Sequence, residues 1–228
     1  MNRKKCILLL DTNEFLGKAA EDYCSTLFDV KCVTRSQRNL KEFPQEVFNT
    51  IHNNKIDYVF NFLSAVKVPI EVINSAKKYA INFHPAPPDY PGVGCASYAL
   101  YDNAKEYGVT AHIMEETYDS GEILSVIRFP ISEGDYCDTL FDRALVYTLM
   151  LFYDILYKLA IKGEIKSCGE EWLRRPSTRK EFEDWMIILP TDPEEEVQRK
   201  IRATRHSRFP GPYVKIFGEY LALPPRKN

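Results

Sequence analysis

A strand that has to stop at a run of prolines constrains this chain more than any other feature. Residues 80–83 are apolar apart from Asn82, and His84 is followed by Pro85-Ala86-Pro87-Pro88. Proline has no backbone N–H for a sheet ladder and its φ is fixed, so the strand ends near His84. Asn82 and His84 lie on the same face of that strand. Because ligands bind beyond the carboxyl ends of strands in an open α/β sheet, both side chains are predicted to border a binding crevice.

The rest of the chain alternates strand and helix patterns, which predicts an α/β fold: a Rossmann-like, mainly parallel wound sheet with flanking helices. The predicted strands cover residues 5–10, 30–34, 58–63, 80–83, 109–114 and 123–131. The predicted helices cover residues 15–24, 44–53, 69–78, 95–107 and 136–161. The last helix is expected to cover the core, although its density of Phe and Tyr also suits a subunit contact and hence a homodimer. The first turn, at 11–17, holds a single glycine, so a NAD or FAD site is rejected.

The length of 228 residues and the hydrophobic fraction of 45% suit one sizeable domain with an appendage. We expect a catalytic domain at residues 1–165, followed at 166–228 by a linker, a helix and a small C-terminal hairpin extension. The formal net charge is -2 and the pI about 6.1, which leaves no basic surplus for a phosphate backbone, so no nucleic-acid partner is expected. The apolar run at 6–10 is too short for a signal peptide. No stretch is expected to reach the ~20 apolar residues of a membrane span, which predicts no membrane partner.

The tail carries its own helix and hairpin signals. Asp192 is the predicted N-cap of a helix with Pro193 in its first turn, and acidic residues follow before its end near Thr204. Strands at 214–217 and 220–223 are then predicted to pair as a hairpin.

Cysteine and histidine patterns exclude several kinds of site. The six cysteines form no Cys-x-x-Cys pair, so we expect reduced thiols in a cytoplasmic protein. No cluster of His, Cys and carboxylates has metal-ligand spacing, so no metal is expected. Cys95 invites a thiol-nucleophile interpretation, but it has no dedicated base. His112, inside a predicted strand, is more simply a structural residue than a ligand.

A third polar residue, Asp119, lies in a turn between two predicted strands. Ser120-Gly121 is a turn pair, and an apolar strand pattern resumes at Ile123. A carboxylate on this loop can approach His84. An amide that donates and accepts, an imidazole that exchanges a proton near neutral pH, and a carboxylate together suit acyl chemistry.

The order and spacing of these residues resemble one family. Asn82-x-His84-Pro85, then Gly108-Val109-Thr110, then Asp119-Ser120-Gly121-x-Ile123-Leu124 are similar to the motifs of the folate-dependent formyltransferases, best over residues 56–135. The resemblance implies catalytic roles for Asn82, His84 and Asp119, and 10-formyltetrahydrofolate as the formyl donor. It also implies that the donor is bound by Leu63, Ser64, Ala65, Val66, Met114 and Thr117.

The tail looks most like that of the nucleotide-sugar N-formyltransferases of O-antigen and lipopolysaccharide biosynthesis. This resemblance implies a small-molecule partner, a nucleotide-linked amino-dideoxysugar, with a 4-amino-4,6-dideoxyhexose expected by analogy. The sequence departs from the family at Pro87, where the family usually has leucine, which leaves the geometry of that loop open. The tail arginines suit a solvated helix end that complements the helix dipole as well as they suit a nucleotide. The implied acceptor-binding residues are Tyr90, Gly92, Arg202, Arg205, Phe209 and Tyr213.

Other functions stay open at this point. A glycinamide ribonucleotide-type purine formyltransferase would share the core and differ in its acceptor. A formyltetrahydrofolate hydrolase would use water as acceptor, but normally carries a regulatory domain before the core, whereas Lys5 opens the catalytic fold directly. A silent folate- or nucleotide-binding protein would not require His84 and Asp119. The further β-barrel domain of methionyl-tRNA formyltransferases is not expected in this chain.

Overall fold

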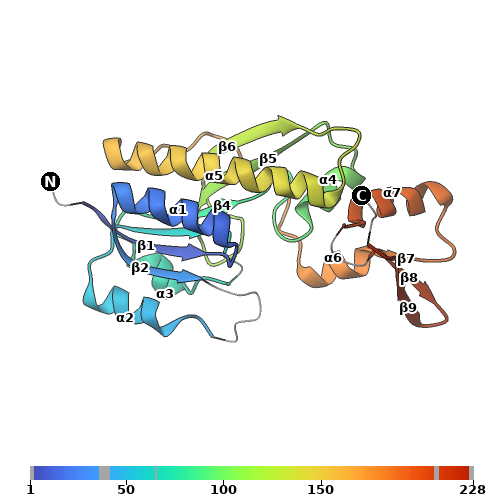
Figure 1. Ribbon diagram of the computed structural model, residues 1–228, viewed down its shortest axis with the longest axis horizontal. Helices are drawn as coiled ribbons and strands as arrows, with labels where there is room; N and C mark the ends of the chain where they lie inside the picture. The colour runs from blue at the N-terminus through green and yellow to red at the C-terminus, as the bar shows by residue number, and fades with distance from the viewer. Residues whose placement is uncertain (1–2, 36–41, 65, 208–210, 226–228) are drawn as a thin grey trace.

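The computed structural model describes residues 3–35, 42–64, 66–207 and 211–225. The predicted site residues Ala65 and Phe209 lie outside these ranges. An α/β body holds the first five helices, and a smaller tail lies beside it at the carboxyl edge of the sheet (Figure 1).

A six-stranded sheet forms the centre of the body, in the order β2-β1-β3-β4-β5-β6. Strands β2, β1, β3 and β4 run parallel, whereas β5 is antiparallel to both of its neighbours. The predicted mainly parallel sheet is therefore confirmed. The bounds are β1 Lys5–Leu10, β2 Asp29–Arg35, β3 Tyr58–Phe62, β4 Tyr79–His84, β5 Glu106–Ile113 and β6 Ile123–Pro130.

Helices cover both faces of the sheet, because side chains alternate along each strand between two apolar cores. Leu8 and Phe60 belong to the core shared with α1 and α5, whereas Leu9 and Val59 belong to the core shared with α2 and α3. All five residues of β3 are buried, as expected of a strand covered on both faces. The helices are α1 Glu14–Leu27, α2 Gln45–Asn53, α3 Ile70–Ser75, α4 Cys95–Tyr101 and α5 Cys137–Lys162.

Helix α5 spans 26 residues and is apolar enough, by length and composition, to cross a membrane. The prediction that no stretch approaches a membrane span was therefore too strong. Leu151, Phe152 and Ile155 of α5 are fully buried, and the helix runs along the body beside α1 (Figure 1). One face of the helix therefore packs on the core of the body.

Helix α4 is shorter than predicted, and β5 begins earlier. The helix ends at Tyr101 instead of residue 107, because Asn103 adopts a left-handed φ of 51°, a conformation that ends helices. The chain then turns into β5 at Glu106.

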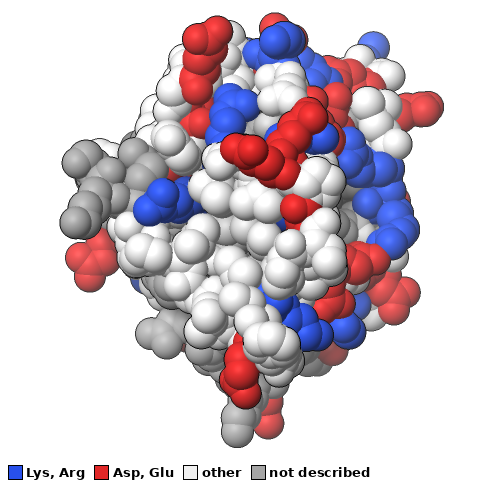
Figure 2. Space-filling model, turned by 90° about the vertical axis from the view of Figure 1, so that its right-hand side faces the viewer, with Lys and Arg blue, Asp and Glu red and all other residues white. Residues whose placement is uncertain are grey.

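The tail contains more regular structure than predicted. A three-stranded sheet in the order β7-β8-β9 and helix α6 accompany the expected helix α7, which packs against α4. Figure 2 faces this end of the molecule, where uncharged surface fills the middle and acidic and basic side chains are mixed around it. The elements are α6 Arg179–Trp185, β7 Ile187–Ile188, α7 Glu194–Thr204, β8 Tyr213–Ile216 and β9 Glu219–Ala222.

Two predicted boundaries in the tail shift by one residue. Pro193, not Asp192, is the N-cap of α7, because the Asp192 carboxylate instead accepts hydrogen bonds from the Leu189 N–H at 3.0 Å and Lys200 Nζ at 3.2 Å. The hairpin turns one residue earlier than predicted, at Phe217-Gly218. Both residues have a positive φ, 48° and 89°, as in the two-residue turns that match the twist of paired strands. A domain boundary at residue 165 stays a prediction.

Candidate active site

Three polar side chains form one row across the carboxyl-end half of the sheet. Asn82 in β4 pairs with Asn61 in β3 and with His112 in β5, so all three project from the same face, the one that α2 and α3 cover elsewhere. Asn61 Nδ2 donates to Asn82 Oδ1 at 2.9 Å, and Asn82 Nδ2 lies 3.0 Å from His112 Nε2. His84 follows two residues after Asn82 and therefore shares this face.

Asp119 joins this row from the turn between β5 and β6. Its Oδ2 atom accepts from the Gly92 N–H at 2.8 Å and lies 3.4 Å from His84 Nδ1. Its Oδ1 atom lies 3.3 Å from His112 Nε2 and 3.4 Å from Asn82 Nδ2. The structure thus brings Asn82, His84 and Asp119 together, on one strand end and one turn.

His112, which the sequence places inside a strand as a structural residue, also belongs to the cluster. Its Nδ1 atom lies 2.8 Å from the Ile113 carbonyl, which leaves Nε2 for Asn82 and Asp119. The signal is the antiparallel register that pairs His112 with Asn82. A single strand pattern does not contain that register, because it depends on where the two strands meet.

Burial and charge set the protonation of the cluster. Burial alone would raise the pKa of the Asp119 carboxyl, but His84, His112 and the Gly92 N–H outweigh it and lower this pKa to about 2. Burial lowers the pKa of His84, and the negative charge of Asp119 offsets this effect only in part. Near pH 7 the cluster therefore holds an ionised carboxylate beside a neutral His84 imidazole.

Exposure differs within the cluster. His84 and Asp119 are each 6% exposed, whereas Asn82 stays partly exposed at the surface of the site. Asn61 is 7% exposed, and its Oδ1 atom has no hydrogen-bond partner among the described residues. The amide row thus offers one free acceptor and one partly exposed donor to a ligand.

The residues predicted to bind the donor lie on two neighbouring segments. Leu63 has a left-handed φ of 62° just after β3, and the loop that continues through Ser64 and Val66 meets the Asp119 turn, where Lys67 Nζ lies 5.9 Å from the centre of the Tyr118 ring. Met114 is buried in the core beneath α3. Thr117 is exposed, and its carbonyl accepts from Ser120 Oγ at 3.0 Å.

The residues predicted to bind the acceptor divide into two groups. Tyr90 and Gly92 adjoin the cluster: the Tyr90 carbonyl lies 3.3 Å from His84 Nε2, and the Gly92 N–H holds Asp119. The Tyr90 ring is buried, with the Arg174 guanidinium 4.7 Å from its centre.

The tail residues of that set lie elsewhere. Arg202 donates to Asn103 Oδ1 at 3.1 Å, just past the C-terminal end of α4, and the Arg205 carbonyl accepts from Cys137 Sγ at 3.5 Å, at the start of α5. Tyr213 lies in β8 of the tail sheet. In this structure none of the three is among the residues in hydrogen-bond or ion-pair contact with the Asp119 cluster.

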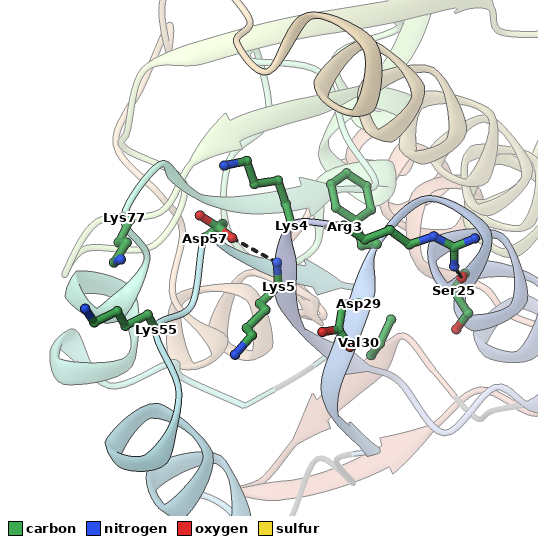
Figure 3. Close-up of a pocket in the computed structure, with 10 residues that line it drawn as sticks. Arg3, Lys4, Lys5, Ser25, Asp29, Val30, Lys55, Asp57 and Lys77 are labelled. Carbon is green, nitrogen blue, oxygen red and sulfur yellow. Dashed lines mark hydrogen bonds between the residues drawn. The ribbon is translucent and has the colours of Figure 1, made fainter. Parts of the chain in front are cut away.

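A separate hollow of about 750 Å³ opens at the amino ends of the strands, opposite the cluster. Figure 3 shows the side chains of Lys4, Lys5 and Lys55 pointing away from one another around it, while the Lys5 N–H donates to Asp57 at 2.9 Å. These cations do not converge on one point, so the hollow does not extend the candidate site.

The described residues bring neither a reactive thiol nor a metal-binding group to the site. Burial raises the pKa of the Cys95 thiol, which keeps it in the unreactive protonated form. In the described ranges, no group of three or more His, Cys, Asp or Glu side chains is arranged to hold a metal ion. Independence from metals stays a prediction.

A wound α/β sheet that gathers an amide, imidazoles and a carboxylate at the carboxyl ends of its strands is of the class suited to acyl-group transfer. The comparison with known families agrees with this class. The model of the formyl transferase family matches residues 15–151, more than half of the chain and including every member of the cluster. The chain belongs to the formyl transferase family.

Two relatives illustrate the sequence similarity. The methionyl-tRNA formyltransferase of Pediococcus pentosaceus is 32% identical over 156 residues, which cover 67% of this chain and 47% of that protein. The GDP-perosamine N-formyltransferase of Brucella melitensis is 28% identical over 160 residues, which cover 69% of this chain and 60% of that protein. The chain thus spans about half the length of the curated relatives it matches.

Solved structures extend the likeness to the tail. A sugar N-formyltransferase from Shewanella sp FDAARGOS_354 gives a TM-score of 0.77 at 18% identity, over 96% of each chain. An N-formyltransferase from Helicobacter canadensis, solved with folinic acid and dTDP-3-aminofucose, gives 0.70 at 19% identity, over 96% of this chain and 85% of that chain. At these identities the likeness establishes the fold.

Proposed function

We propose that this protein transfers the formyl group of 10-formyltetrahydrofolate to the amine of a nucleotide-linked amino-dideoxysugar, with a 4-amino-4,6-dideoxyhexose as the expected sugar. The observation that carries this proposal is the convergence of Asn82, His84 and His112 on one buried carboxylate, with distances to Asp119 of 3.3 to 3.4 Å. The cluster lies at the carboxyl edge of the sheet, where ligands of such folds bind.

His84 is the group that receives the proton in this proposal. We assign the hydrogen of the neutral imidazole to Nδ1, which lies 3.4 Å from Asp119 Oδ2, so that Nε2 has a lone pair for the proton of the attacking amine. Once protonated, Nε2–H faces the Tyr90 carbonyl at 3.3 Å. The fixed Asp119 charge stabilises the imidazolium until the C–N10 bond of the tetrahedral intermediate breaks, and the same proton then passes to N10 of the departing tetrahydrofolate.

Asn82 is the proposed donor to the formyl oxygen, where negative charge builds as the amine attacks. Its Nδ2 group faces His112 at 3.0 Å and Asp119 at 3.4 Å. The longer contact is the weaker one, and it is the contact that a developing oxyanion would replace. Loss of such a donor typically slows turnover roughly 10²- to 10³-fold.

The donor-binding and acceptor-binding sets stay predictions. The unpartnered Asn61 Oδ1, buried beside Asn82, supports a ligand with an N–H group, such as a pterin, next to the loop at 63–66. Folinic acid bound to the Helicobacter canadensis protein supports a folate donor, and the dTDP-3-aminofucose of the same structure supports a sugar-nucleotide acceptor. For the tail, Arg205→Ala should weaken sugar-nucleotide binding; an unchanged affinity would favour a purely structural helix end.

The place of the protein in the cell and its assembly are also predictions. A role in O-antigen or lipopolysaccharide synthesis and a cytoplasmic location are expected from the proposed acceptor. A homodimer is supported by one exposed apolar face of α5, formed by Val146, Met150, Tyr157 and Ile161, each 54 to 63% exposed. Light scattering on wild type and Met150→Glu would test it; two monomers of equal mass would contradict it.

The first experiment is a mass measurement of the acceptor after incubation with 10-formyltetrahydrofolate. The panel holds dTDP-, UDP- and GDP-linked 4-amino- and 3-amino-dideoxysugars, glycinamide ribonucleotide and methionyl-tRNA. A gain of one formyl group on a sugar nucleotide is the expected result, and Asn82→Ala and His84→Ala should slow it by roughly 10²-fold or more.

The other arms decide between rivals. The 32% identity to a methionyl-tRNA formyltransferase favours methionyl-tRNA as the second candidate acceptor. Formylation of methionyl-tRNA or glycinamide ribonucleotide alone would keep the chemistry and overturn the sugar acceptor. Hydrolysis of the donor without any formylated acceptor would make the protein a formyltetrahydrofolate hydrolase.

A further inference from the structure

Residues 169–178, between α5 and α6, cross directly over the loop that follows His84; we call this segment the strap. The Leu173 N–H donates to the Pro88 carbonyl at 3.2 Å, and the Ser177 N–H donates to the Pro91 carbonyl at 3.2 Å. The Val93 N–H in turn donates to the Ser177 carbonyl at 3.0 Å. Three backbone hydrogen bonds thus fasten the strap to the loop at 85–94.

Trp172 fastens the strap to the opposite side of the site. Its Nε1–H donates to the Gly121 carbonyl at 2.8 Å, two residues beyond Asp119. Since Leu173 binds the Pro88 carbonyl, the adjacent residues Trp172 and Leu173 connect the turn that carries Asp119 to the loop that follows His84.

The indole also contacts both imidazoles of the cluster. Its centroid lies 5.0 Å from that of His112 with the ring planes at 88°, and 6.1 Å from that of His84 at 66°. Both are edge-to-face arrangements within the range of favourable aromatic packing. A ring held in this way limits rotation of the imidazoles and excludes water from that side of them.

We propose that Trp172 is a positioning residue of the formyl-transfer site: it fixes the spacing between the Asp119 turn and the His84 loop, and it holds both imidazoles in their reactive orientation. The catalytic part of this inference rests on the proposed function. The contact of the indole with the imidazoles does not, so the two parts can be tested separately.

The electrostatics of His84 agree with such a cover. Burial is the largest influence on the pKa of His84 and lowers it. The charged or titratable groups that face His84 are the Asp119 carboxylate, which raises that pKa, and the His112 imidazole, which lowers it; the Tyr90 carbonyl also raises it. Removal of the indole hydrates His84 and moves its pKa upward.

Steady-state kinetics of two variants test the catalytic part. Trp172→Phe keeps an aromatic ring and loses the Nε1–H donor, whereas Trp172→Ala loses both. We expect Trp172→Ala to lower kcat roughly 10- to 100-fold, the usual cost of removing a group that orients a catalytic side chain, with the KM of the sugar nucleotide changed less than about threefold. The acid limb of the pH profile should move to higher pH, and Trp172→Phe should fall between Trp172→Ala and wild type.

The matched control is Trp185→Phe. Trp185 is the second tryptophan of the chain and packs on Tyr98 and Tyr101 of α4, away from the histidines. The Trp185→Phe variant should retain the wild-type kcat and the wild-type pH profile. A kcat of Trp172→Ala within about twofold of wild type would overturn the positioning role, and a faster variant would do so as well, because Trp172 would then be a lid that has to move.

Fluorescence tests the contact without any substrate. In Trp185→Phe the single remaining indole is Trp172, and a protonated imidazole quenches a neighbouring indole. Emission should therefore fall as the pH drops below about 6.5, because the pKa of His84 is lowered from that value. The step should shrink in a Trp185→Phe variant that also carries His84→Gln.

The two readouts separate the possible failures. Emission that is the same in Trp185→Phe and in Trp185→Phe with His84→Gln, down to the pH at which the protein unfolds, would overturn the contact itself. A pH-dependent emission together with an acceptor panel in which nothing is formylated would overturn the proposed function and, with it, the catalytic part of this inference. If an acceptor is formylated and Trp172→Ala keeps the wild-type kcat, only the positioning role would be overturned.

Discussion

Asp119 has more polar contacts than any other member of the site. A substitution that removes its negative charge and keeps its shape therefore tests its role. Asp119→Asn keeps an oxygen for the Gly92 N–H, now 2.8 Å away, but places no negative charge beside the imidazoles. We expect kcat to fall roughly 10²- to 10⁴-fold, the range for impaired acid-base catalysis, while the fold survives. Formyl transfer and far-UV circular dichroism measure the two effects.

Asp89→Asn is the control for that substitution. Asp89 lies on the loop after His84 but pairs with Arg128 at 2.9 Å and is partly exposed. It should leave kcat near the wild-type value. Equal losses in the two variants would mean that any charge change on this side of the molecule disturbs the site, and the special role of Asp119 would be lost.

His84 also makes the stability of the protein depend on pH in a predictable direction. Its pKa is lower in the folded state than the ordinary 6.5, so the unfolded chain binds the proton more tightly. Stability from this group is complete above the unfolded pKa and is lost as the pH falls through the window down to the folded pKa. Urea unfolding of wild type should therefore show a free energy that decreases from pH 7.5 to about pH 5, and His84→Gln should show a shallower slope. A parallel slope in both proteins would contradict the assignment.

Residue identities predicted part of the site. The order and spacing of Asn82, His84 and Asp119 in the sequence predicted them, and the structure brings the three together; their catalytic roles stay predictions. His112 was not predicted as a site residue, because its role depends on the register between β4 and β5. Trp172 was not either: it reaches the cluster only because the strap folds back across the loop at 85–94, and no local pattern encodes that path.

At the scale of elements, Gly92 shows how closely the strap approaches the site. Its φ is +88°, and a Cβ atom there would lie 2.3 Å from the Ser177 carbonyl oxygen and 2.4 Å from the Ser177 nitrogen. Both are backbone atoms, so the strap itself would have to move. We expect Gly92→Ala to lower the free energy of unfolding by about 3 kcal/mol or more and to lower kcat, because the Gly92 N–H holds Asp119.

Gly218→Ala separates strain from contact. Gly218 has nearly the same φ, +89°, and a Cβ atom added there would have nothing within 4 Å among the described residues. Gly218→Ala should lower the free energy of unfolding by only roughly 1 to 2 kcal/mol, the cost of holding alanine in a left-handed conformation. Chemical unfolding of both variants gives the difference, which measures the strap contact; equal losses would show that the strap yields freely.

Predictions of elements succeeded where burial is continuous and failed where short polar signals compete. Strand β3 is apolar in four of its five residues and was placed within one residue. Helix α4 was extended too far because Asp102-Asn103 was not recognised as its end. Helix α6 was missed, although Thr178 and Glu181 form a capping box at its start, the one local signal in a segment otherwise dominated by charge.

At the scale of the whole molecule, the tail is bound to the body through α4 and the strap. Tyr101 donates to Glu196 of α7 at 2.7 Å, and the Arg199 guanidinium lies 4.0 Å from the centre of the Tyr101 ring. Trp185 of α6 packs on Tyr98 at 4.7 Å. Because the strap also covers the histidines, an intact site requires both parts in place.

This coupling predicts that body and tail unfold together. Both tryptophans, Trp172 and Trp185, lie in the tail segment, whereas the two longest helices, α1 and α5, lie in the body. Thermal unfolding followed by tryptophan fluorescence and by circular dichroism at 222 nm should therefore give coincident transitions, the behaviour of one cooperative unit. Tyr101→Phe removes the hydroxyl that binds Glu196, at a cost of about 1 kcal/mol, and should lower both midpoints equally. A fluorescence transition that precedes the circular dichroism transition, or a shift of the fluorescence midpoint alone in Tyr101→Phe, would show that the tail detaches from a folded body, and the strap would then be a dissociable cover of the histidines.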